Sequence, residues 1–171
     1  IEKEEMTVDF PVQIYSYIIP SPAFGHKDYY AFNLLTELLF SNSNSLVNTS
    51  VVSEGNMAYQ IVPSTDESRM YNNYATFDVV MQAAMGNAKV KKVINKEIND
   101  IIVDGPEQEI IDNYISNLEA QEAFAKYSNN SIAYELGFAE YYYKDYTKYN
   151  AKMEAYKKIK ADDLKIIAQT Y

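Results

Sequence analysis

Three stretches of the chain are rich in β-branched and aromatic residues, and each predicts a β-strand. The first, residues 12–19, reads VQIYSYII and stops at a proline, which cannot donate a hydrogen bond within a sheet. Residues 58–63 and 73–84 are the other two. The alternating apolar positions of the third stretch are Ala75, Phe77, Val79 and Met81. A period of two is typical of an antiparallel sheet with one buried face.

Most of the other apolar positions recur with the spacing of an α-helix. The predicted helices cover residues 26–41 and 45–53, then one from Gly86 to Asp104, one from Pro106 to a break at SNNS (128–131), one ending near Tyr143, one over 148–158, and one from Asp162. We expect Pro106 at the first helical position, where its missing N–H group costs nothing. Glu107 and Glu109 then lie at the positive end of the helix dipole.

The order of these elements predicts an α+β fold in which helices flank an antiparallel sheet. We expect residues 1–171 to form a single domain, because this length suffices to bury one sizeable core. Three strands are few for so many helices, and the chain begins without methionine. We therefore expect a fragment of a longer chain, with one further strand beyond Tyr171.

The charge and composition exclude several classes of function. The formal net charge is −9, so the chain repels phosphate backbones, and nucleic acid is not an expected partner. No apolar run approaches the roughly 20 residues that a membrane-spanning helix needs. The chain has no cysteine, which excludes disulfides, thiolate catalysis and cysteine-bound metal.

His26 is the only histidine, and no set of catalytic or metal-binding residues accompanies it. A zinc site without cysteine generally needs a second histidine, and the sequence H-x-x-E-H is absent. No G-x-S-x-G elbow supports a Ser-His-Asp triad. We interpret His26 as an exposed first-turn residue, and Asp162 and Asp163 as charges that cap the last helix. The residues thus predict no catalytic residue and no metal ligand in this chain.

Residues 139–149 read AEYYYKDYTKY and are unusually rich in tyrosine. Exposed tyrosine rings can form a binding platform for a peptide or a sugar. The alternative is that they pack two antiparallel helices across the KDYT turn and keep their hydroxyl groups in water, which suits half-buried tyrosines. We favour the packing interpretation.

The stretch from Ser45 to Val62, SLVNTSVVSEGNMAYQIV, predicts a short helix, a turn at Gly55 and Asn56, and a strand that begins near Tyr59. Together with GHKDYYAFNLLTELLF (25–40), DGPEQEII (104–111) and KIKADDLKIIAQTY (158–171), it resembles one family in segment order and spacing. The chain resembles the second, non-zinc-binding domain of a half-subunit of the pitrilysin/insulinase zinc metallopeptidases, which include the mitochondrial processing peptidases.

The resemblance implies a processing-peptidase-like α+β domain with no zinc site of its own. Zinc is expected in the preceding domain of the parent protein, which carries the H-x-x-E-H motif. The expected partners are that preceding domain, the other half of the peptidase on the same or a second chain, and peptide substrates. The chain would form one wall of the substrate chamber, where Tyr59 is the candidate substrate-binding residue. A soluble protein of the periplasm or another bacterial compartment is compatible with the resemblance.

The sequence departs from the family pattern at the position where an arginine helps to hold substrate in the partner half, because that position is Val52 here. An Arg-Tyr substrate clamp is therefore not complete, although Tyr59 is kept. Two alternatives remain at this point. The parent can be a proteolytically inactive relative that serves as a peptide-binding or assembly module, or the chain can be a tyrosine-rich ligand module that only mimics the family.

Overall fold

The structure is a computed structural model, and it describes residues 12–65, 73–82 and 86–171. Its elements in chain order are β1 (Ile14–Pro20), α1 (Tyr29–Thr36), the π-helical turn η1 (Glu37–Ser41), α2 (Leu46–Asn48), the π-helical turn η2 (Thr49–Ser53), β2 (Ala58–Thr65), β3 (Tyr74–Met81), α3 (Asn87–Asp104), α4 (Gln108–Ala125), α5 (Asn129–Tyr143), the 3₁₀ turn η3 (Tyr146–Asn150), α6 (Ala151–Tyr156) and α7 (Ala161–Thr170). This confirms the predicted α+β class.

The three described strands form one antiparallel sheet in the order β1-β3-β2. The central strand β3 places Phe77 opposite Tyr17 of β1 on one side and opposite Pro63 of β2 on the other. The strands β1 and β2 are therefore the outer strands of the described sheet. The predicted alternation in β3 is confirmed, because all four of its apolar positions from Ala75 to Met81 are fully buried.

The main hydrophobic core lies on the face of the sheet that η1 and η2 cover. Phe40 of η1 stacks on Phe77, with ring centroids 4.1 Å apart and an interplanar angle of 20°. Helix α3 adds Val90 and Ile94 to the same cluster, and α7 adds Leu164. Because these residues come from both ends of the chain, the core joins the sheet to the last helix.

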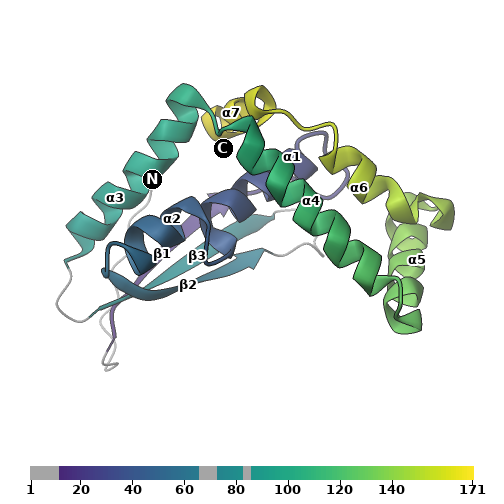
Figure 1. Cartoon of the computed structure of the whole chain (residues 1–171), viewed down its shortest axis with the longest axis horizontal. Coiled ribbons are helices and arrows are strands. Elements are labelled where there is room, and N and C mark those ends of the chain that lie inside the picture. Colours follow the sequence, from purple (N-terminus) through teal and green to yellow (C-terminus); the bar gives the residue numbers. More distant parts are fainter. Residues whose placement is uncertain (1–11, 66–72, 83–85) are drawn as a thin grey trace.

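Helices α4, α5 and α6 extend away from the sheet (Figure 1). The first half of α4 is anchored by Ile111 and Ile115, whereas its end exposes Phe124. Helix α5 turns back along η3 and contributes only Ala139 to the fully buried residues. None of the helices in the described part of the chain is long and apolar enough to cross a membrane.

Several predicted boundaries are wrong by a few residues, and each has a local cause. Pro106 precedes α4 rather than starting it, because Gly105 takes a positive φ of 77° and Glu107 caps the helix. The predicted helix 148–158 is a 3₁₀ turn followed by the short α6. At the last helix, the Asp163 carboxylate accepts a hydrogen bond from the Lys160 N–H at 2.9 Å, as the capping interpretation requires.

Candidate functional site

The chain turns from η2 into β2 at a tight corner around Gly55, as the sequence predicts. The N–H of Met57 donates to the carbonyl oxygen of Val51 at 2.8 Å, and Asn56 adopts a left-handed φ of 46°. A Cβ atom on Gly55 would lie 2.2 Å from the backbone oxygen of Ser50, so only glycine fits without displacing the chain. The corner thus fixes where β2 starts.

Tyr59 lies at a β-bulge immediately after this corner. Ala58 pairs with Met81 and Gln60 pairs with Val80, so Tyr59 is the extra residue between two neighbouring pairs. Its side chain is 61% exposed, whereas Ala58 is buried. Bulges redirect side chains and occur preferentially at sheet edges and beside binding sites. The structure therefore presents the candidate substrate-binding residue to solvent on an outer strand.

The face of the sheet opposite the core carries a patch of exposed apolar side chains. The exposed members of this open face are Ile14 and Ile18 of β1, Val62 of β2 and Tyr74 of β3. Ile18 is the most exposed of them at 68%. Polar residues such as Ser16 and Thr76 share this face with them. Exposed apolar side chains gathered on one face are a mark of interaction sites in soluble proteins. No element among the described residues covers these four side chains.

One charged group lies within the open face. The Asp78 carboxylate, in the middle of β3, accepts a hydrogen bond from the Ser16 hydroxyl of β1 at 2.6 Å. Asp78 also pairs across the sheet with Val62 of β2. This hydrogen-bonded carboxylate is the charged group of a face that also carries polar residues such as Thr76 and Gln60, and a partner that covers it has to satisfy its remaining lone pairs.

The residues described for this chain do not fit a zinc ion. His26 lies in the loop before α1, with a half-exposed side chain, and its Nδ1 is 3.6 Å from an oxygen of Asp28. Within the described ranges, no three His, Cys, Asp or Glu side chains come together in a way that could hold a metal. Val52, which occupies the position of the family's arginine, packs against the hydrophobic core.

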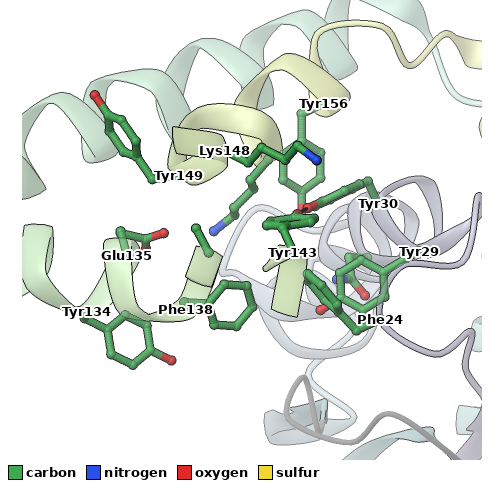
Figure 2. Close-up of a pocket in the computed structure, with 13 residues that line it drawn as sticks. Phe24, Tyr29, Tyr30, Tyr134, Glu135, Phe138, Tyr143, Lys148, Tyr149 and Tyr156 are labelled. Carbon is green, nitrogen blue, oxygen red and sulfur yellow. Dashed lines mark hydrogen bonds between the residues drawn. The ribbon is translucent and has the colours of Figure 1, made fainter. Parts of the chain in front are cut away.

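The tyrosine-rich segment lines a cavity of about 140 Å³ beside α1, α5, η3 and α6 (Figure 2). Tyr143 and Tyr149 from that segment contribute to its lining, together with Phe24 and Tyr30 from the other end of the chain. Residues of the segment thus pack against another part of the chain and also line a cavity. Tyr143 is half-buried and packs on Phe24, whereas Tyr141 is exposed.

A tyrosine pair closes one side of this cavity. The hydroxyl groups of Tyr30 and Tyr143 share a hydrogen bond, which joins α1 to the end of α5. Burial, followed by this hydrogen bond, raises the pKa of Tyr30 far above its ordinary value of 10.0. Tyr30 therefore stays neutral at physiological pH and contributes a ring and a hydroxyl to the wall.

The fold is similar to three solved structures. A protease from Helicobacter pylori has a TM-score of 0.84 at 18% identity, over 96% of this chain and 39% of that chain. A peptidase M16 inactive domain from Pseudomonas fluorescens has a TM-score of 0.78 at 16% identity, over 95% and 39%. The inactive peptidase domain of a candidate zinc protease from Bordetella parapertussis has a TM-score of 0.77 at 16% identity, over 92% and 83%.

At these identities the solved structures establish a common fold only. A comparison with curated proteins found no match. The family described as the Peptidase M16 inactive domain matches residues 2–118, well over half of the sequence. This confirms the resemblance noted from the four sequence segments. The chain therefore belongs to the pitrilysin/insulinase peptidases, the M16 family, as one of their inactive domains.

Proposed function

We propose that residues 1–171 form one domain of a longer peptidase chain and serve as a non-catalytic wall of its substrate chamber. The parent protein would be a zinc-dependent metalloendopeptidase, with the zinc held by the preceding domain. The family assignment supports this role, and so do two similar solved chains of which this sequence covers only 39%. The observation that carries the proposal is the open face of the sheet, whose four exposed apolar side chains a neighbouring domain would cover.

The test of this function compares the chain alone with the full-length parent protein. We expect the chain alone to hydrolyse no peptide, and the parent to hydrolyse unstructured peptides in a reaction that a zinc chelator stops and added zinc restores. Zinc-dependent hydrolysis by the purified chain would refute the non-catalytic role. A parent without peptidase activity that still binds peptides would instead establish the assembly or peptide-binding module.

The open face supports packing against the preceding domain, because its apolar side chains gain stability only when water is removed from them. We expect Ile18→Asp to change the stability of the isolated chain little, since residue 18 is mostly exposed there. In the full-length protein the same substitution places an unpaired carboxylate in the interface. We expect a loss of about 2 kcal/mol, seen as an unfolding midpoint several degrees lower.

Ile166→Asp is the matched control for this prediction, because Ile166 lies on α7 with a side chain 58% exposed. We expect it to be tolerated in both the isolated chain and the full-length protein. Equal effects of the two substitutions in the full-length protein would contradict the proposed interface. Such a result would leave the open face without a special role.

Tyr59 is proposed to contact the peptide substrate from the bulge of β2. A contact that is equally strong in the bound substrate and in the transition state raises KM when it is lost and leaves kcat unchanged. We therefore expect Tyr59→Ala in the full-length protein to raise KM for peptides about three- to tenfold. Tyr127→Ala is the control, because Tyr127 is 88% exposed at the turn between α4 and α5. An unchanged KM for Tyr59→Ala would remove Tyr59 from the substrate site.

A further inference from the structure

The cavity beside α5 is separate from the open face of the sheet and from Tyr59. Its lining brings together residues from three parts of the chain (Figure 2). Tyr29 and Tyr30 come from α1, Glu135 and Phe138 from α5, and Tyr156 from α6. The lysines Lys148 and Lys152 reach it from η3 and α6. No residue of the open face takes part.

The apolar part of the cavity is a set of aromatic rings fixed by contacts with one another. Phe24 lies at the centre of this set, with ring centroids 5.1 Å from Tyr29, 5.2 Å from Phe138 and 5.3 Å from Tyr143. Tyr30 packs on Tyr156 at 5.3 Å. Three of these four pairs are edge to face and the Phe24–Tyr143 pair is tilted, so the rings present both faces and edges to a further ring. The cavity is therefore formed before any ligand enters it.

The size of the cavity suits one aromatic ring. Its volume is about 140 Å³, and an apolar protein cavity of about 150 Å³ is known to bind benzene. In Figure 2, Phe24 and Phe138 lie on one side, Lys148 and Tyr156 lie on the other, and Tyr143 lies between them beside Tyr30. A ring placed between them would contact aromatic side chains on both sides.

The charged residues of the lining favour a ligand of negative charge. Two lysines and one glutamate give this lining a net positive charge, although the whole chain carries −9. The Nζ atom of Lys148 lies 3.8 Å from a carboxylate oxygen of Asp145. In the part of the chain that the structure describes, Lys152 and Glu135 have no ion-pair partner, and Lys152 is half-buried. A ligand carboxylate could pair with the free amine of Lys152 and share Lys148 with Asp145, whereas a ligand cation beside Lys152 would meet a like charge.

We propose that this cavity binds an aromatic carboxylate, with the ring among the aromatic side chains and the carboxylate towards Lys148 and Lys152. Two sources share this chemistry: a small aromatic acid, and the C-terminal aromatic residue of a peptide. Aromatic burial supplies the affinity, and the lysines supply the preference for an anion. Glu135 repels the carboxylate and keeps the site weak.

The test titrates 3-phenylpropionate into the full chain by calorimetry. We expect saturable binding, with phenethylamine, which has the same ring and the opposite charge, at least tenfold weaker. Propionate, which lacks the ring, should bind at least tenfold weaker as well. Equal affinity for the acid and the amine, or no saturable binding of 3-phenylpropionate up to about 10 mM, a very weak limit on the affinity scale, would overturn the proposal.

Three substitutions locate the site. Lys152→Gln should weaken 3-phenylpropionate binding about tenfold, as expected for the loss of one charge-assisted hydrogen bond. Glu135→Gln should tighten it, because a like charge is removed. Lys92→Gln on the exposed surface of α3 is the matched control and should change nothing. Thermal unfolding checks that the Lys152→Gln and Glu135→Gln variants remain folded. If both folded variants bind 3-phenylpropionate as tightly as the unchanged chain, the assignment of the cavity is wrong.

A pair of peptides distinguishes the two sources. A pentapeptide ending in phenylalanine with a free carboxylate is compared with its C-terminal amide. Displacement of 3-phenylpropionate by the free peptide alone would support a peptide terminus as the ligand. Displacement by neither peptide, with binding of the small acid intact, would support a small aromatic acid.

Discussion

Replacing Phe77 with alanine is expected to destabilise the chain by about 3–5 kcal/mol, the range for removing a large aromatic side chain from a core. Phe77 is fully buried on the central strand β3, where its neighbours belong to both outer strands. Its ring also stacks on Phe40 of η1. The substitution removes apolar contact on all of these sides and leaves a cavity that a central strand cannot close. Chemical denaturation of the isolated chain measures the loss.

Phe124→Ala is the matched control, because Phe124 is 75% exposed at the end of α4. The same change of side chain there should alter the free energy of unfolding by no more than about 0.5 kcal/mol. Similar losses for the two variants would mean that Phe77 does not lie in the core. This comparison tests the fold itself, on which the open face and the corner at Tyr59 both depend.

The core side of the sheet could be predicted because its signal is local. In β3 the apolar residues recur at every second position, and a period of two assigns them to one face without knowledge of the neighbouring strands. Helix α3 is similar, since Val90, Ile94 and Ile101 recur with helical spacing and all three are buried. Periodicity within one element is thus enough to find the residues of the core.

The open face could not be predicted in this way. Strand β1 carries Tyr15 and Tyr17 on the core side and Ile14 and Ile18 on the other, so both of its faces are apolar in sequence. A strand with two apolar faces is equally consistent with burial on both sides. Only the three-dimensional arrangement shows that one side is uncovered, and that is the side for which we propose a partner.

The bulge at Tyr59 and the aromatic cavity could not be predicted from the sequence either. A bulge depends on the register between β2 and β3, and the sequence of one strand alone does not determine that register. The cavity brings Phe24 and Tyr30 against Tyr143, and the hydroxyl pair of Tyr30 and Tyr143 is separated by 113 residues. Residues 139–149, which are unusual in composition, form part of one wall of the cavity, although the sequence favoured packing over binding there. It could not identify the opposite wall or Lys152.

Replacing Gly55 with alanine is expected to destabilise the chain by about 3 kcal/mol, at the upper end of the usual cost of overpacking. The added methyl group would lie 2.2 Å from the backbone oxygen of Ser50 and 3.2 Å from that of Val51. Neither contact is with a flexible side chain. Ser50 cannot move away freely, because its hydroxyl donates to the Glu97 carboxylate of α3 at 2.9 Å. The chain must therefore shift at the corner.

Gly137→Ala is the control, and we expect it to change the stability of the chain in the opposite direction. Gly137 lies inside α5, and a Cβ atom there would meet nothing within 4 Å. Alanine at that position should stabilise the chain by up to about 1 kcal/mol, the difference in helix propensity between the two residues.

Because Tyr59 follows the corner by four residues, Gly55→Ala should also raise KM for peptides in the full-length protein, whereas Gly137→Ala should not. A stable Gly55→Ala variant with unchanged KM would show that the corner does not position Tyr59 for substrate.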